Sequence, residues 1–96
     1  MIGIVATLRI QPAKIAEFEA LMLGLAAKVK ANEPGCLFYE LTKSRAEPNT
    51  YKVLEGYRDQ AAVDQHSSSD YFRAAMGTMR ECFADKPVIE LSDSVE

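Results

Sequence analysis

The sequence contains no tryptophan, a single histidine and only two cysteines among its 96 residues. One histidine and two distant cysteines, Cys36 and Cys82, cannot make a typical zinc site, so no metal ligands are predicted. The two thiols could form one disulfide. Without an export signal, however, we expect both to stay reduced, as in a cytoplasmic protein.

An excess of positive charge is also missing, because the formal net charge is −3. The chain cannot neutralise a phosphate backbone or an anionic membrane surface, so we expect neither nucleic acid nor membrane as a partner. No apolar run approaches the length of a transmembrane helix. The apolar start over residues 1–12 has no charged leader and is interrupted by Arg9, so it is interpreted as a strand, not a signal peptide.

Two common catalytic motifs are absent. No glycine-rich loop follows a strand to hold a phosphate, and no Gly-x-Ser-x-Gly motif presents a serine nucleophile. The serines at 67–69 are interpreted as a helix break. The composition, 48% hydrophobic and 26% charged, is typical of a folded protein, and the length predicts one domain over residues 1–96.

Hydrophobic periodicity gives the order of the elements. Residues 2–10 alternate between two faces as in a strand, and apolar residues from Ile15 to Val29 recur every three or four positions as in a helix. The expected elements are a strand over 2–10, a helix from Pro12 to before Pro34-Gly35, strands over 36–44 and 50–58, a helix over 60–66, a helix ended by Asp85-Lys86-Pro87, and a strand over 88–92.

This order predicts an α+β protein of the ferredoxin-like split-βαβ type, a four-stranded antiparallel sheet with helices on one face. The other face does not look polar. Cys36 and Phe38 share one face of the second strand and Tyr39 lies on the other; on the third strand Leu54 lies opposite Tyr51. Apolar groups on both faces predict a homodimer formed through the open sheet face.

Glu55 shares its strand face with Tyr51, Val53 and Tyr57. A carboxylate beside apolar and aromatic side chains is either an exposed charge on an edge strand or an inward-pointing group held by a hydrogen-bond donor. The residue pattern by itself favours the exposed position, since most ionisable side chains are exposed.

His66 falls at the end of the short helix. It is either a cation at a helix C-terminus or a pocket base that titrates near neutral pH, and the pattern favours neither. The second half of the chain is rich in aromatic residues, namely Tyr39, Tyr51, Tyr57, Tyr71 and Phe72. Such stripes are usually core, but some can line a pocket between helices and sheet. Met76 and Met79 are interpreted as adaptable core filler.

Three segments taken in order resemble one family. Residues 33–41 (EPGCLFYEL) open the second strand with Glu-x-Gly-Cys-x-x-Tyr, and residues 51–59 (YKVLEGYRD) place an aromatic two positions after Glu55. Residues 61–72 carry His66, then Ser69 and an aromatic pair. Their order and spacing are similar to those of the antibiotic biosynthesis monooxygenase family, including its small quinol monooxygenases, over nearly the whole chain.

The resemblance implies a dimeric α+β barrel that binds a flat phenolic, quinol or polyketide-like molecule between helices and sheet. Several members oxidise such molecules with dioxygen and no metal or flavin, so no cofactor is expected. On this hypothesis His66 is the general base that takes a hydroxyl proton, and Glu55 holds the imidazole by a hydrogen bond. The residues expected to bind the substrate are Tyr39, Tyr51, Tyr57, Phe72 and Met76.

Departures from the family pattern and two rival hypotheses remain. Tyr57 stands where the family often has tryptophan. The haem-degrading branch uses asparagine, tryptophan and histidine at positions that here hold Ala6, His66 and Met76, so haem degradation is not expected.

One rival is a family isomerase that acts on a phosphorylated linear dione. Its substrate needs a basic anchor, for which Arg9, Arg58 and Arg73 are the candidates. The other rival is a dimer that binds a ligand without turning it over.

Overall fold

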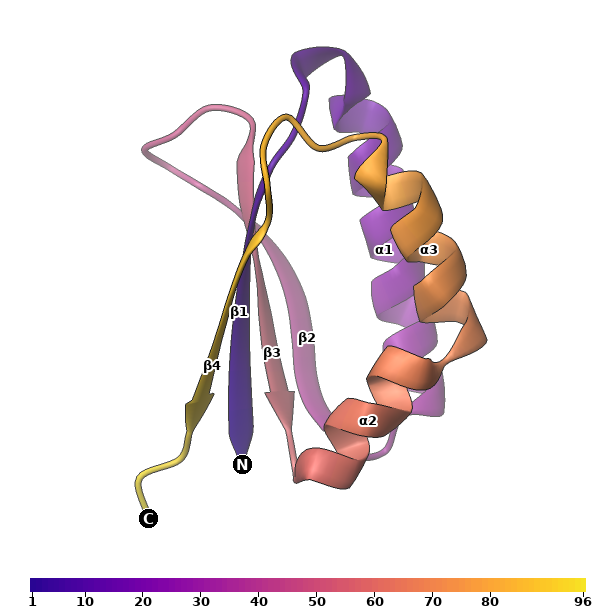
Figure 1. Cartoon of the computed structure of the whole chain (residues 1–96), viewed down its shortest axis with the longest axis vertical. Helices are drawn as coiled ribbons and strands as arrows, with labels where there is room; N and C mark the ends of the chain where they lie inside the picture. The colour runs from indigo at the N-terminus through magenta and orange to yellow at the C-terminus, as the bar shows by residue number, and fades with distance from the viewer.

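A four-stranded sheet backed by one layer of helices makes up the computed structural model of the chain, which describes all 96 residues (Figure 1). The elements are β1 (Ile2–Arg9), the 3-10 turn η1 (Pro12–Lys14), α1 (Ile15–Asn32), β2 (Cys36–Lys43), β3 (Thr50–Tyr57), α2 (Gln60–Ser68), α3 (Asp70–Arg80) and β4 (Val88–Asp93). The strand order is β2-β3-β1-β4 and every neighbouring pair is antiparallel. The predicted α+β ferredoxin-like fold is confirmed.

The core lies between the sheet and the helices. Leu8 on the central strand β1 and Ile10 just after it are buried against the apolar stripe of α1, of which Phe18 and Val29 are fully buried. Each large apolar side chain buried in this way stabilises the fold by about 1.5–3 kcal/mol. The alternation read along residues 2–10 and the helical spacing after Ile15 therefore predicted the correct inner faces.

A β-bulge corrects the predicted faces of β2. Cys36 pairs with Tyr57 and Phe38 pairs with Gly56. Leu37 is therefore an extra residue on β2 that has no pairing partner on β3. Because a bulge interrupts the two-residue alternation, Cys36 packs partly against the core while Phe38 lies on the outer face. The prediction that these two residues share a face is wrong.

The last helix ends earlier than predicted. α3 stops at Arg80, and Phe83 instead forms an isolated bridge with Ile10. The side chain of Gln11 donates to the carbonyl oxygens of Glu81 and Phe83, at 3.0 Å each. Gln11 therefore satisfies two of the carbonyl groups that follow the helix end, before Asp85-Lys86-Pro87.

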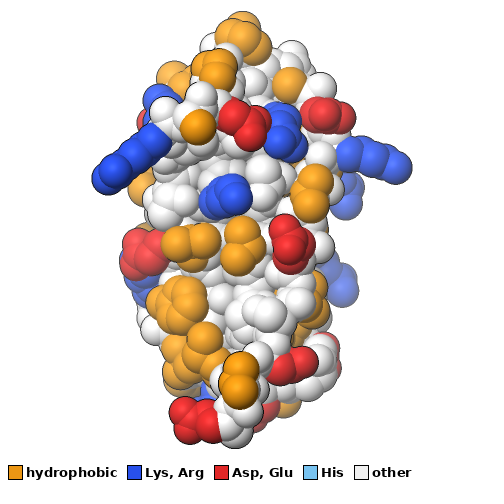
Figure 2. Space-filling model, turned by 90° about the vertical axis from the view of Figure 1, so that its left-hand side faces the viewer, with side chains coloured by type: hydrophobic (Ala, Val, Ile, Leu, Met, Phe, Trp, Pro, Cys, Tyr) orange, Lys and Arg blue, Asp and Glu red, His pale blue; other side chains and the backbone are white.

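The outer face of the sheet carries no helix and mixes apolar with charged side chains (Figures 1 and 2). One row runs across all four strands, from Glu40 through Leu54 and Val5 to Glu90. Phe38 and Leu54 are exposed there. The open face therefore has an apolar centre with a carboxylate at each edge.

Candidate functional site

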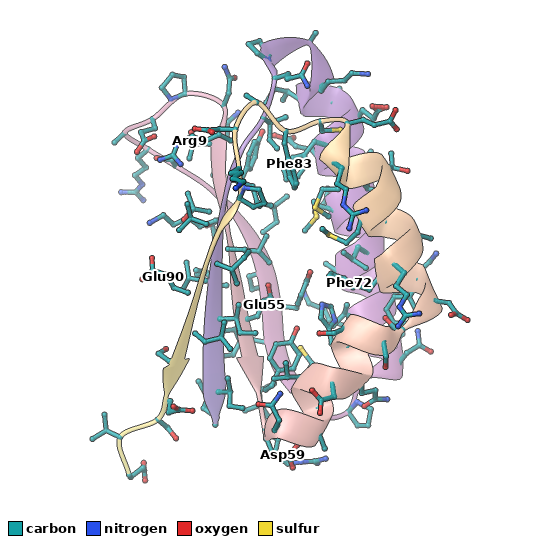
Figure 3. All side chains as sticks on the ribbon, viewed as in Figure 1. Arg9, Glu55, Asp59, Phe72, Phe83 and Glu90 are labelled. Carbon is teal, nitrogen blue, oxygen red and sulfur yellow. The ribbon has the colours of Figure 1, made fainter.

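A cavity of about 270 Å³ lies between the sheet and the α2–α3 segment. Its walls are largely apolar, with Phe72 and Met76 from α3 facing Ile4 and Val53 from the sheet. In Figure 3, Glu55 on the sheet and Phe72 on α3 both project into the space between the two layers. Ligand pockets are usually apolar clefts with a few convergent polar groups, and the polar side chains here are Tyr39, Glu55, His66 and Ser67.

Glu55 points inward from β3 and is only 8% exposed. The prediction that Glu55 is exposed is therefore wrong. The carboxyl group can be buried because Tyr57 donates a hydrogen bond of 2.7 Å to Glu55 Oε1. Residues two positions apart on a strand point to the same face, so the alternation of β3 places the Tyr57 hydroxyl beside the Glu55 carboxyl group. The alternative stated above, an inward carboxyl group held by a donor, describes Glu55.

His66 reaches the cavity from α2. This helix begins after Asp59, whose Oδ1 accepts a 3.0 Å hydrogen bond from the backbone N–H of Ala62, as expected of an N-cap. His66 lies in the last turn and is buried. Its ring is surrounded by the rings of Tyr39, Tyr57 and Phe72, with centroids at 5.4, 5.5 and 4.5 Å.

Glu33, not Glu55, holds the imidazole. The Nδ1 atom of His66 lies 3.1 Å from both carboxylate oxygens of Glu33, and no hydrogen bond joins His66 to Glu55. The predicted Glu55–His66 hydrogen bond is therefore wrong. Tyr71 donates a second hydrogen bond to the Glu33 carboxylate.

Glu33 belongs to the segment that carries the family resemblance, but no feature of the sequence ties it to His66. The fold brings the two together because α1 ends at Asn32 and the next residue, Glu33, lies against His66 of α2. A buried carboxylate of this kind needs partners, and Glu33 has two.

Three polar atoms on buried side chains at the cavity have no protein partner. They are His66 Nε2, the Tyr39 hydroxyl and Glu55 Oε2, none of which takes part in a hydrogen bond within the chain. No buried side-chain nitrogen or oxygen in the chain lacks a partner. These three atoms therefore keep accessible surface and are free to bind a ligand.

Burial controls the charge of the groups around the cavity. It raises the pKa of the Glu55 carboxyl, and the nearby Glu33 charge acts in the same direction, while the Tyr57 hydrogen bond and His66 oppose it. Burial also raises the pKa of Tyr39 and of Tyr57, with the Glu55 charge adding to both. Both phenols are therefore neutral hydrogen-bonding groups at physiological pH.

The other predicted binding residues divide into two groups. Phe72, Met76 and Tyr39 line the cavity. Tyr57 does not line the cavity, but it contacts two residues that do, Glu55 by a hydrogen bond and His66 by ring packing. Tyr51 lies elsewhere: its hydroxyl donates to Glu19 and its ring packs on Phe18 at 4.9 Å.

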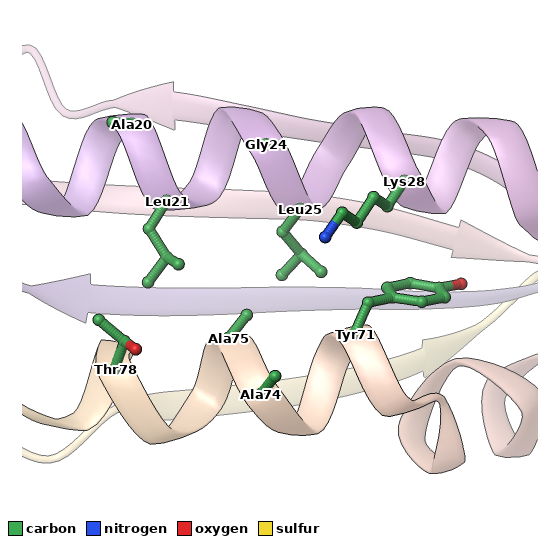
Figure 4. A pocket seen from close by; sticks show the side chains of 9 residues that line it. All are labelled: Ala20, Leu21, Gly24, Leu25, Lys28, Tyr71, Ala74, Ala75 and Thr78. Carbon is green, nitrogen blue, oxygen red and sulfur yellow. The ribbon is translucent and has the colours of Figure 1, made fainter.

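A second hollow of about 390 Å³ runs along the outer surface between α1 and α3 (Figure 4). Small side chains such as Ala20, Gly24 and Ala74 line most of it. Tyr71 stands at one end near Lys28, with its hydroxyl directed away from the hollow's apolar floor (Figure 4). This groove contains no pair of acid and base, in contrast to the inner cavity.

No three histidine, cysteine or acidic side chains gather in a way that could hold a metal ion. None of the helices has both the length and the hydropathy needed to cross a membrane. The Cys36 thiol is half-buried, and burial together with the Glu33 and Glu55 charges raises its pKa to about 11. Cys36 is accordingly a protonated packing residue and not a nucleophile.

Comparison with known proteins finds a family model and a solved structure that carry the same family description. The model of the family described as "Antibiotic biosynthesis monooxygenase" matches residues 1–78. A crystal structure from Caulobacter crescentus, described as a putative antibiotic biosynthesis monooxygenase, is 58% identical, with a TM-score of 0.96 over 99% of this chain and 90% of that one.

Two curated relatives are more distant. "Putative monooxygenase YcnE" of Bacillus subtilis is 30% identical over 81 residues, which is 84% of each chain. "Uncharacterized protein sll1783" of Synechocystis is 31% identical over 71 residues, or 74% of this chain. The match spans about half, 48%, of the length of that Synechocystis protein.

Proposed function

The chain belongs to the antibiotic biosynthesis monooxygenase family, and on that premise we propose that it oxidises a small phenolic or quinol substrate with dioxygen, without a cofactor. The family match and the names of its relatives support a monooxygenase-like function in general. The observation that carries the finer proposal is the cavity itself. An imidazole nitrogen and a carboxyl oxygen, both without partners, meet there on walls that are otherwise apolar and aromatic.

In the proposed reaction His66 Nε2 removes the proton of a substrate hydroxyl group. The electron-rich anion passes one electron to dioxygen, and the resulting radical pair combines to form a carbon–oxygen bond. The hydroperoxide then loses water, so that a quinol and one dioxygen become a hydroxyquinone and one water. His66 returns its proton to the departing oxygen and is ready for another cycle.

The cavity favours a neutral substrate. Its lining includes Glu55 but no lysine or arginine, and the Glu33 carboxylate lies just behind His66. An anionic group placed here meets carboxyl groups without a cation to balance it. The volume of about 270 Å³ lies just below the usual range for ligand pockets, about 300–1,000 Å³, and so favours a small molecule.

The same observation argues against the phosphorylated dione. Its three candidate anchors, Arg9, Arg58 and Arg73, do not line the cavity. Arg9 instead pairs with Glu47 at 3.3 Å. Arg58 lies 3.6 Å from its neighbour Asp59. The isomerase hypothesis therefore finds no support in the site, although oxygen uptake remains the direct way to separate the two reactions.

We place the homodimer through the outer face of the sheet. Phe38 is 39% exposed and Leu54 is 37% exposed on that face, a large share for apolar side chains in the middle of a sheet. Figure 2 shows charges of both signs among the apolar side chains of this face. The pairing register puts Lys52 in the row of Thr42 and Thr7, and Glu90 on the edge strand β4. In a dimer with two-fold symmetry, the apolar centre of one subunit packs against the apolar centre of the other, so both are buried.

Oxygen consumption by the metal-free protein tests the proposed function. A naphthoquinol and an anthrone serve as substrates, and His66→Gln and a protein-free solution serve as controls for spontaneous oxidation. We expect uptake by the wild-type protein that His66→Gln reduces to the background rate. Binding of either compound without uptake contradicts the proposal and favours the non-catalytic dimer, in which a ligand at a hundred times its Kd adds about 2.7 kcal/mol to stability.

A further inference from the structure

The Glu33 carboxylate meets two donors inside the protein. Its oxygens lie 3.1 Å from His66 Nδ1, and Tyr71 donates to Oε2. The Glu33 side chain is 1% exposed and that of His66 is 6% exposed. We propose that Glu33 is a positioning residue that holds neutral His66 in the Nδ1–H tautomer and so leaves the Nε2 lone pair in the cavity.

The tautomer follows from the hydrogen-bond inventory of the two groups. An ionised carboxylate only accepts hydrogen bonds, so the ring nitrogen beside it must carry the hydrogen. In a neutral imidazole the other nitrogen is then an acceptor. His66 lines the cavity and its Nε2 makes no hydrogen bond within the chain yet keeps accessible surface, which is the arrangement that a general base requires.

The surroundings prevent the ring from turning away. The aromatic rings of Tyr39, Tyr57 and Phe72 enclose the imidazole on several sides. The backbone of His66 is held as well, because its carbonyl oxygen accepts from the Ser69 hydroxyl at 2.8 Å and from the Ser69 N–H at 3.2 Å. Ser69 therefore anchors the helix end that carries the imidazole.

The competing state is an Nε2–H tautomer that donates across the cavity to Glu55. It would leave Nδ1 as an acceptor facing two acceptor oxygens of Glu33, which is an unfavourable contact in a buried site. The structure has the Glu33 contact and lacks the Glu55 contact. Glu55 thus remains available to the ligand and is not used to orient the base.

The catalytic consequence rests on the proposed function. Once His66 accepts a proton, the imidazolium faces the negative charge of Glu33, which stabilises the charged ring at the moment it forms. Because Glu33 lies behind the ring and does not line the cavity, it acts on turnover and not on substrate binding. Tyr71 keeps the carboxylate in place from the other side.

Nitrogen NMR of the wild-type protein tests the tautomer directly, because His66 is the only histidine and gives the only imidazole signals. The spectrum is recorded on ¹⁵N-labelled protein at a pH where the ring signals no longer change with rising pH. We expect a protonated-type shift at Nδ1 and an unprotonated-type shift at Nε2. An Nε2–H tautomer, or averaged shifts from a mixture, overturns the proposal.

The variant Glu33→Gln tests the role of the charge, with Glu81→Gln, an exposed position after α3 and outside the cavity, as the matched control. A glutamine side chain both donates and accepts, so we expect mixed tautomers in the NMR spectrum. With a quinol that the wild type oxidises, kcat should fall about tenfold or more while KM stays within about twofold, since general-base catalysis contributes about 10²–10⁴-fold. A single Nδ1–H tautomer and an unchanged kcat in Glu33→Gln contradict the positioning role.

The two readouts keep the inference separate from the proposed function. If the wild type shows the Nδ1–H tautomer but takes up no oxygen, the positioning of His66 stands and the monooxygenase fails. If oxygen is consumed and the tautomers are mixed, the monooxygenase stands and the role of Glu33 fails.

Discussion

The Tyr57 hydroxyl donates a 2.7 Å hydrogen bond to Glu55 Oε1, and it thereby holds a carboxyl group that lines a largely apolar cavity. The hydrogen bond favours the ionised carboxylate, yet burial is the larger effect and raises the pKa of Glu55 above its ordinary value. The carboxyl group therefore keeps its proton to higher pH in the folded chain than in the unfolded one.

This difference predicts how stability depends on pH. Between the ordinary pKa of glutamate and the raised pKa of Glu55, the folded state binds a proton that the unfolded state has lost, so the free energy of unfolding falls as pH rises. The variant Glu55→Gln removes this loss and keeps a side-chain oxygen for the Tyr57 hydroxyl. Urea denaturation across this pH range should show wild-type stability falling relative to Glu55→Gln.

The control is Glu81→Gln, which changes the same chemical group at an exposed position after α3. Its stability should follow that of the wild type at every pH. Parallel pH profiles for wild type and Glu55→Gln would mean that burial does not raise the pKa of Glu55.

Two glycines that differ in their surroundings predict opposite effects of alanine. A Cβ added at Gly35 would lie 2.6 Å from the Cβ of Ala62, a contact that neither rigid group can relieve. We expect Gly35→Ala to lower the free energy of unfolding by about 1–3 kcal/mol. A Cβ at Gly24, in the exposed middle of α1, meets nothing within 4 Å, so Gly24→Ala should raise it by about 0.5–1 kcal/mol. Equal effects of the two changes in chemical denaturation would refute this packing argument.

The outer sheet face predicts a dimer that a single charge disrupts. The variant Leu54→Lys places an ammonium group in the apolar centre of the proposed interface, next to Val5 on the neighbouring strand. We expect a dimer for the wild type and a monomer for Leu54→Lys in analytical ultracentrifugation. Leu23→Lys changes a residue that is 62% exposed on α1 and should leave the dimer intact. A monomeric wild type, or a dimer that only Leu23→Lys disrupts, contradicts this interface.

Local features of the sequence predicted much of the fold and part of the site. The alternation in β1 and β3 gave the inner faces because both strands pair without interruption. Asp59 was recognisable as an N-cap because capping depends on a few consecutive residues. The bulge at Leu37 was not predictable from alternation, since one extra residue reverses the faces on one side of it.

The missed features are non-local. Glu33 and His66 are 33 positions apart, and only the packing of α2 beside the end of α1 brings them together. The backbone after the early end of α3 is bound by the Gln11 side chain, which is 70 positions from the Glu81 carbonyl that accepts its hydrogen bond. Residue patterns report which face a side chain occupies, but they do not report which partner it meets there.

The most direct test of the central claim, that His66 in the inner cavity drives oxygen insertion, is oxidation of a naphthoquinol under ¹⁸O-labelled dioxygen. Mass spectrometry of the product is compared between wild type and His66→Gln at equal protein concentration. We predict one labelled oxygen atom in each product molecule from the wild type, with one dioxygen consumed, and only the spontaneous rate from His66→Gln. Label incorporation by His66→Gln at the wild-type rate, or oxygen uptake by the wild type with no label in the product, would contradict the account.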